Sequence, residues 1–232
     1  MFQIATPALD PPRISSNQLG EFVFASETKR LSILRGQKFG NPVAAPYYVP
    51  ATSAILRSLE NGRFSVSRLD AAAEAIAAKQ VETRHHASKR ANNLAMLWHF
   101  DRIIEQCNPP AGVHRIVRRN ATIEIDSVMV SVLPEIVTEN LQERFIAFTK
   151  LRFSTSKISP DVSEIILLLL HHYGQRQQRA GMAFDFGRTK IIDCFSETVI
   201  HGQSIGRHRD QQLHRALAQV RRLWPNVEEE QK

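Results

Sequence analysis

A glutamate and a lysine are the residues of this sequence whose types and spacing could do chemistry together. Glu135 precedes an apolar run, and Lys150 ends the second run of the same region. If the polar turn between the runs is centred between residues 142 and 143, Glu135 lies directly opposite Lys150 in a β-hairpin, with Cβ atoms about 5 Å apart. Alternation also places Phe148 and Arg152 on that face, whereas a register shift of one residue would separate the pair.

A carboxylate and a lysine at one point of a sheet favour metal-dependent phosphodiester hydrolysis. A hard divalent cation such as Mg²⁺ or Mn²⁺ requires two or more oxygen ligands, and it activates water and stabilises charge on a phosphate. A nearby lysine could position that water or neutralise the phosphate. We therefore expect Glu135 and Lys150 to be catalytic, with Glu135 also a metal ligand.

The order of Pro134-Glu135, a hairpin and Phe148-Thr149-Lys150 resembles the core of the PD-(D/E)XK nuclease superfamily, and the RecB-type group is the most similar. That group opens with a helix that carries a serine, leucine and phenylalanine motif, and residues 14–22 occupy the opening position here. A helix follows the lysine strand in that group, as residues 161–173 do in this chain. The resemblance extends over residues 13–225.

The resemblance implies that Glu135 is the first metal-binding acid, that Lys150 is the catalytic lysine, and that Mg²⁺ or Mn²⁺ is the cofactor. It also implies a setting in DNA processing or antiviral defence. One position departs from the family pattern, because Phe148 stands where the second acid is expected and a phenylalanine cannot bind a metal. Members of the superfamily can take this acid from another element, so the resemblance makes Glu164, in the next predicted helix, and Asp126, before a valine-rich strand, the candidates here. Cys107 and Cys194 provide no counterpart for the iron–sulfur cysteines of the RecB-type group.

Three interpretations of the pair follow, and the sequence leaves enzymatic activity undecided between them. The protein is a metal-dependent nuclease whose second acid comes from another element, or a degenerate nuclease fold that binds nucleic acid or a protein partner without catalysis. Alternatively, it is an unrelated α+β protein in which Glu135 and Lys150 form an ordinary cross-strand ion pair.

Basic residues are concentrated in two segments of this chain, whose net charge is +7 and whose pI is about 9.8. Residues 13–40 and residues 201–222 each hold more basic than acidic side chains. This distribution favours a polyanion partner such as DNA, although a solvated basic surface would show the same pattern. The candidate nucleic-acid contacts are Lys29, Arg30, Arg152, Arg207, Arg215 and Arg222.

The apolar periodicity divides the chain into a helical part and a part that contains a sheet. Residues 1–13 are expected to be an extended lead-in, and residues 226–232 an acidic tail. Between them, residues 14–225 form a single domain, mainly helical over 14–107 and sheet-containing over 113–225. The predicted class is α/β, of the α+β kind, with a nuclease-like core sheet flanked by helices.

Local signals predict where several elements begin and end. The first helix starts at Ser15 or Ser16 through a capping box and is ended by Gly36 and by Gly40-Asn41-Pro42. A later helix is capped by Ser159 and ends at Gly174. Strands over residues 183–186 and 191–195 are expected to form a hairpin through the Gly187-Arg188 turn. A final amphipathic helix covers about residues 207–223.

The sequence shows no membrane or export signal. Its longest apolar run, residues 165–170, is far too short to cross a bilayer, and the N-terminal residues lack a signal-peptide pattern. Two cysteines without metal-ligand spacing are typical of reduced thiols. We therefore expect a cytoplasmic protein with DNA as its partner, and a protein partner or homo-oligomer is the alternative.

Overall fold

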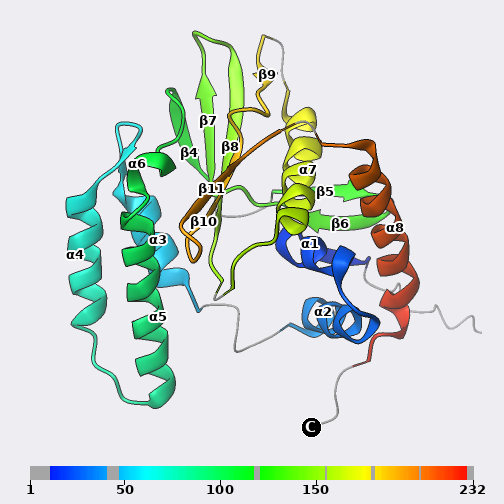
Figure 1. Cartoon of the computed structure of the whole chain (residues 1–232), viewed down its shortest axis with the longest axis horizontal. Coiled ribbons are helices and arrows are strands. Elements are labelled where there is room, and N and C mark those ends of the chain that lie inside the picture. Colours follow the sequence, from blue (N-terminus) through cyan, green and yellow to red (C-terminus); the bar gives the residue numbers. More distant parts are fainter. Residues whose placement is uncertain are drawn as a thin grey trace, which may run out of the picture.

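A computed structural model of the chain describes residues 11–40, 47–117, 121–154, 156–178, 181–203 and 205–228. A central sheet separates a lobe of three helices, α3 to α5, from a second group of helices formed by α1, α2, α7 and α8 (Figure 1). The predicted α+β class is confirmed. Most of the predicted lead-in, residues 1–10, and the end of the predicted acidic tail, residues 229–232, lie outside the described residues.

The helices and strands follow one another with helices first, then mostly strands, then helices and strands in alternation. The helices are α1 (Ser16–Phe24), α2 (Glu27–Phe39), α3 (Val49–Ser58), α4 (Val66–Ala77), α5 (Arg84–Asp101), α6 (Ile104–Cys107), α7 (Pro160–Gln177) and α8 (Arg207–Leu223), with a final 3-10 turn η1 (Trp224–Asn226). The strands are β1 (Arg13–Ser15), β2 (Leu59–Glu60), β3 (Arg63–Phe64), β4 (Val113–Ile116), β5 (Thr122–Ile125), β6 (Val128–Ser131), β7 (Ile136–Asn140), β8 (Phe145–Arg152), β9 (Ala183–Phe184), β10 (Lys190–Asp193) and β11 (Thr198–His201).

The N-terminal helical segment is two helices rather than the single helix that the sequence predicts. Ser15 caps α1 by accepting the Gln18 N–H, as the capping pattern predicts. The chain then turns extended at Ala25, and the Ser26 side chain caps α2 by accepting the Lys29 N–H. The guanidinium of Arg30 donates to the carbonyls of Phe22 and Val23 at the end of α1. The break is therefore stabilised because both helix ends find hydrogen-bond partners.

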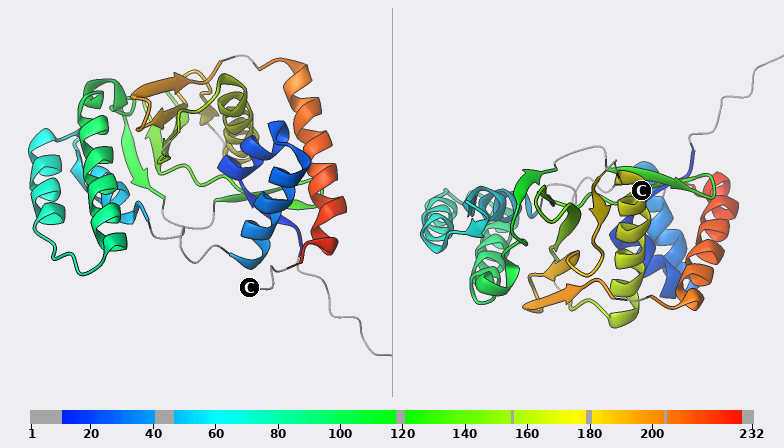
Figure 2. Two further views of the ribbon diagram at one scale, coloured as in Figure 1. Left: turned by 60° about the horizontal axis from the view of Figure 1, so that its bottom comes forward. Right: turned by 90° about the horizontal axis from the view of Figure 1, so that it is seen from above.

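The main sheet has the strand order β11-β10-β8-β7-β4, with β9 also pairing with β8. Strands β7 and β8 form an antiparallel hairpin in which Ile136 lies opposite Thr149 and Asn140 opposite Phe145. This is the register assumed from the sequence. Helix α7 then crosses over the sheet, and β10 pairs with β8 in parallel (Figures 1 and 2). A second, smaller sheet has the order β1-β6-β5.

The predicted hairpin between residues 183–186 and 191–195 is wrong. Both β9 and β10 pair in parallel with the same edge of β8, β9 beside Phe145 and β10 beside Thr149. The turn between them leads from one part of that edge to the next. The antiparallel partner of β10 is instead β11, which the sequence analysis missed.

Helix α7 continues through Gly174 to Gln177, beyond its predicted end. A Cβ atom at position 174 would lie 2.4 Å from the ring of Phe184, a distance that real Cβ atoms do not adopt. This glycine is therefore explained by close packing of α7 against β9, and it does not end the helix. Its cap, by contrast, is the predicted Ser159, which accepts the Val162 N–H at 3.2 Å.

Two hydrophobic clusters lie on opposite faces of the main sheet. Val137, Phe148 and Ile191 join the cluster that contains α1, α7 and α8. Ile136 and Ile192 join the cluster that contains α3, α4 and α5. Alternate residues of the central strands therefore face opposite helix groups, as side-chain alternation requires. The face that carries the predicted site is the one covered by α7.

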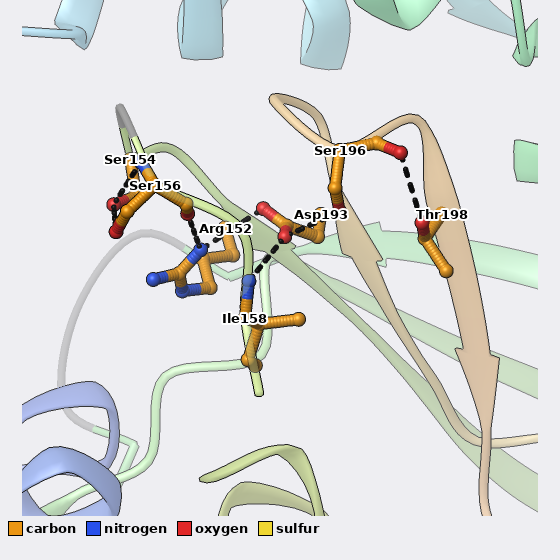
Figure 3. Close-up of polar contacts among 7 residues, drawn as sticks. All are labelled: Arg152, Ser154, Ser156, Ile158, Asp193, Ser196 and Thr198. Carbon is orange, nitrogen blue, oxygen red and sulfur yellow. Dashed lines mark hydrogen bonds and ion pairs between the residues drawn. The ribbon is translucent and has the colours of Figure 1, made fainter. Parts of the chain in front are cut away.

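A buried ion pair between Arg152 and Asp193 joins the ends of β8 and β10 (Figure 3). Nη1 of Arg152 donates to Asp193 Oδ1 at 3.1 Å and to the Ser156 carbonyl at 2.8 Å. Oδ2 of Asp193 accepts the Ile158 N–H at 2.9 Å and the Ser196 hydroxyl at 2.6 Å. The pair thus fixes the connection that leads into α7 and the turn between β10 and β11.

Lys190, at the start of β10, is also buried. Its ammonium donates to the carbonyls of Gln106 at 3.1 Å and Asn108 at 2.6 Å, which lie at the end of α6. Burial lowers the pKa of Lys190 from 10.5 to about 8, and this effect exceeds the opposing influence of Cys107. The helical lobe is therefore joined to the sheet by a lysine that loses its proton more readily than an exposed one.

The Asp193→Ala variant is expected to lose about 3–5 kcal/mol of unfolding free energy, because it leaves the Arg152 charge buried without a counter-ion. Glu60→Ala is the matched control, since Glu60 pairs with Arg68 at the surface and such pairs contribute about 1 kcal/mol or less. Urea denaturation followed by circular dichroism measures both. Equal losses in the two variants would contradict the structural role of Asp193.

The stability contributed by Lys190 is expected to depend on pH. Its pKa is lower in the folded state than in the unfolded state, so the unfolded chain binds more protons between about pH 8 and 10.5. The contribution is therefore complete above about pH 10.5 and is lost as the pH falls through 8. Relative to Lys190→Met, the wild type should gain up to about 1.4 kcal/mol per pH unit above pH 8. Urea denaturation at pH 7, 8 and 9 tests this, and a constant difference would contradict it.

Candidate functional site

Glu135 and Lys150 meet at the end of the β7–β8 hairpin. Glu135 directly precedes β7, and the ladder that pairs Ile136 with Thr149 places it opposite Lys150. The ammonium of Lys150 donates to the carbonyls of Val132 at 2.9 Å and Leu133 at 3.1 Å. The Glu135 carboxylate accepts the Leu151 N–H at 2.6 Å. Each side chain is therefore held by the backbone of the neighbouring segment.

Burial of Glu135 and Lys150 disfavours the charged form of both side chains. Burial raises the pKa of Glu135, against the lowering effects of Lys150 and of the Leu151 N–H. Burial lowers the pKa of Lys150, against the raising effect of Glu135. Only 4% of Lys150 is exposed, and its donors already serve two carbonyls. In this arrangement the lysine stabilises the bend before β7 and presents no open cation to a substrate.

Phe148 fills the position at which the family pattern has its second acid. Its side chain is 1% exposed. Its ring lies 5.3 Å from the rings of both Tyr173 on α7 and Phe184 on β9. The backbone N–H of Phe148 donates to the Thr189 hydroxyl at 3.2 Å. An aromatic cluster therefore occupies the floor beside Lys150, and a carboxylate placed there would be buried among apolar groups.

The two candidates for the second metal-binding acid each pair with a side chain of α8. Glu164 on α7 forms an ion pair with Arg209, which also pairs with Asp161. Asp126, in the turn between β5 and β6, lies 2.6 Å from Nδ1 of His214. Among the residues that the structure describes, no three or more histidine, cysteine, aspartate or glutamate side chains form a group that could hold a metal ion. The structure therefore does not gather Glu164 and Asp126 with Glu135 into one site.

The candidate nucleic-acid contacts divide into exposed, capping and buried residues. Lys29, Arg207, Arg215 and Arg222 are exposed. Arg30 is half-buried and caps α1. The expected contact of Arg152 with nucleic acid is wrong for this structure, because only 5% of the residue is exposed and its guanidinium is paired with Asp193. The strand pairing between β8 and β10, which the sequence analysis missed, draws this arginine inside.

The two basic segments of the sequence lie side by side in the fold (Figure 2). The ammonium of Lys38, on α2, donates to the carbonyls of Trp224 at 3.0 Å and Val227 at 2.9 Å, just beyond α8. Arg30 and Arg215 line one shallow pocket together with Gln212 and Gln219. We call the exposed surface of α2 and α8 the basic face. Lys38 helps to hold α2 and α8 together. It is not among the contacts that the sequence predicts.

The two basic segments account for the net charge of the whole chain. Residues 13–40 hold five basic and two acidic residues, and residues 201–222 hold five basic and one acidic. Ten basic and three acidic residues give +7, which equals the net charge of all 232 residues. Basic and acidic residues therefore balance over the rest of the sequence. Folding brings the two segments together, with Arg209 paired to Asp161 and Glu164 of α7 and with Arg207, Arg215 and Arg222 exposed.

No protein-family model matches this chain, and no curated protein is similar enough in sequence to match it. Within the described ranges, no helix has both the length and the apolar content needed to cross a membrane.

If Lys150 is structural, Lys150→Met should lose about 3–5 kcal/mol of unfolding free energy, because two carbonyls and Glu135 lose their partner. Glu135→Gln should lose less, because its amide oxygen can still accept the Leu151 N–H. Urea denaturation of both variants measures the difference. A Lys150→Met variant as stable as the wild type would mean that the lysine is not part of the framework.

Proposed function

We propose that this protein binds DNA through the basic face of α2 and α8, on a nuclease-like core that does not itself cleave the strand. The observation that carries the proposal is that the entire net positive charge of the chain falls in two segments that fold side by side. Phosphate groups supply most of the affinity of sequence-independent DNA binding, and a concentrated basic surface is its electrostatic counterpart.

The spacing of exposed arginines on α8 suits a phosphate backbone. Arg207, Arg215 and Arg222 are separated by eight and seven residues, close to two helical turns each, so they project toward one side of the helix. A guanidinium can donate two parallel hydrogen bonds to one phosphate. Contacts of this kind fix the position of a protein on DNA without reading its sequence. The proposal is therefore a binding protein with little base preference.

Absence of cleavage follows from the state of the Glu135–Lys150 pair. Its lysine already donates to two backbone carbonyls, and Phe148 stands within an aromatic cluster where a second acid would be needed. A role in DNA processing or antiviral defence, in the cytoplasm, is part of the proposal and rests on the resemblance to RecB-type proteins. A protein partner that uses the same fold is a further candidate for that setting.

A second candidate function is metal-dependent hydrolysis of DNA. It is favoured by the opposition of Glu135 and Lys150 and by the order of hairpin, α7 and parallel β10. Glu135 would hold Mg²⁺ or Mn²⁺ there, which would supply an activated water. This function needs another acid near Glu135 and a Lys150 side chain released from its carbonyls, so we rank it second.

Fluorescence anisotropy with single- and double-stranded DNA at several salt concentrations tests binding. The Arg215→Ala/Arg222→Ala variant should bind at least tenfold more weakly than the wild type. Its plot of log affinity against log salt should be shallower by about 1.8 on duplex DNA, since each phosphate contact contributes about 0.9 to that slope. The matched control is Arg63→Ala/Lys157→Ala, which removes two exposed charges elsewhere.

Two results would contradict the proposal. One is the absence of salt-dependent binding by the wild type, and the other is an equal loss in the control variant. The same DNA incubated with Mg²⁺ or Mn²⁺ separates the two candidate functions. Cleavage that Glu135→Gln abolishes while keeping the fold would favour the hydrolase, and intact DNA is the result expected here.

A further inference from the structure

We propose that a pocket in the helical lobe binds a nucleotide, with its phosphate on lysines and its ring on an apolar wall. The pocket has a volume of about 210 Å³ and lies between the end of α4 and the first turns of α5. Helices α4 and α5, which line it, lie on the far side of the main sheet from α2 and α8 (Figure 1). The proposal therefore goes beyond DNA binding by α8, and either one can fail without the other.

Basic side chains reach this pocket from α5 and from the end of α4. His86, Lys89 and Arg90 are spaced i, i+3 and i+4 along α5, which aligns them on one side of the helix. Lys79 joins them from the end of α4. Arg90 donates to the carbonyls of Ala77 at 3.2 Å and Lys79 at 3.0 Å, which fixes the α4 end against α5. The cationic side of the pocket is therefore held in place by the fold.

These charges are not neutralised within the part of the chain that the structure describes. No carboxylate pairs with Lys79, Lys89 or Arg90 there, and no aspartate or glutamate is among the described residues that line the pocket. Like charges gathered in a concave site focus a positive potential on whatever enters it. The chemistry of the pocket therefore selects an anion, and a phosphate group accepts the hydrogen bonds that lysine and arginine donate.

Apolar side chains complete the lining of the pocket. Pro50, Ile76 and Val81 are among the lining residues, and Ile76 belongs to the core of the lobe. Asn93 also lines the pocket, and its amide oxygen accepts the Ala51 N–H at 2.9 Å. A ligand that fits must therefore combine a flat or apolar body with an anionic group, as a nucleotide does.

The size of the pocket sets the size of the ligand. Its volume is below the roughly 300–1,000 Å³ of sites for drug-sized ligands, so it suits one nucleotide ring with part of its sugar phosphate. A larger groove of about 550 Å³ runs on from it along α3 and α4 and shares Pro50, Ile76 and Lys79 with it. The ligand is therefore a free nucleotide or the terminal nucleotide of a strand, and both present the same phosphate and ring.

Nuclear magnetic resonance with ¹⁵N-labelled full-length protein locates the ligand. Adenosine monophosphate should shift the amide signals of residues 76–93, with a dissociation constant below about 1 mM, equivalent to about −4 kcal/mol. Adenosine, which lacks the phosphate, should bind at least tenfold more weakly. The Lys79→Ala/Lys89→Ala variant should lose at least tenfold in affinity for the monophosphate, and Arg63→Ala/Lys157→Ala should bind like the wild type.

Oligonucleotides distinguish the two sources of the nucleotide. If a strand with a 5′-phosphate shifts the amide signals of residues 76–93 more than the same strand with a 5′-hydroxyl, the ligand is the end of a strand. If the two strands have equal effects, the ligand is the free nucleotide. The proposal is overturned if the monophosphate leaves residues 76–93 unshifted or shifts only residues 207–222. It is also overturned if adenosine or inorganic phosphate binds as tightly as the monophosphate.

Discussion

Complete burial of β8 is the constraint on which the rest of this structure depends. All eight residues from Phe145 to Arg152 are buried, because β7 pairs with one edge, β9 and β10 with the other, and helices cover both faces. A buried strand that carries Lys150 and Arg152 must supply partners for two charges, since an unpaired buried charge is strongly destabilising. The carbonyls before β7 accept hydrogen bonds from the lysine, the negative charge of Glu135 favours its protonated form, and Asp193 pairs with the arginine.

That requirement separates Glu135 and Lys150 from the surface proposed to bind DNA. The polar groups of the hairpin are used inside the molecule, where they hold the bend before β7 and the entry to α7. Exposed basic side chains lie elsewhere, on α2 and α8, and further basic side chains line the pocket of the helical lobe. On this account the proposed binding depends on helices outside the hairpin.

The fold class and the central hairpin could be predicted from sequence because both depend on local patterns. The change from helical to alternating periodicity marks the sheet, and the polar turn at residues 140–143 fixes the register of Glu135 against Lys150. The caps at Ser15 and Ser159 follow from side chains close to the helix ends that they satisfy.

What could not be predicted depends on contacts between distant segments. The parallel pairing of β10 with β8 is set by the crossover of α7. A sequence pattern that does not reveal this pairing predicts an exposed cation at Arg152, whereas the structure makes Arg152 the partner of Asp193. Gly174 reads as a helix end because its contact with Phe184 cannot be seen in the sequence. Glu164 and Asp126 read as candidate ligands because their partners, Arg209 and His214, come from a helix much later in the chain.

Hydrogen exchange with and without DNA, in the presence of Mg²⁺, tests the central claim most directly. The account predicts that DNA slows exchange of backbone amides in residues 27–39 and 207–223, leaves residues 133–151 unchanged, and is recovered uncut. Protection centred on residues 133–151, together with cleaved DNA, would contradict it and would place the function at the Glu135–Lys150 pair.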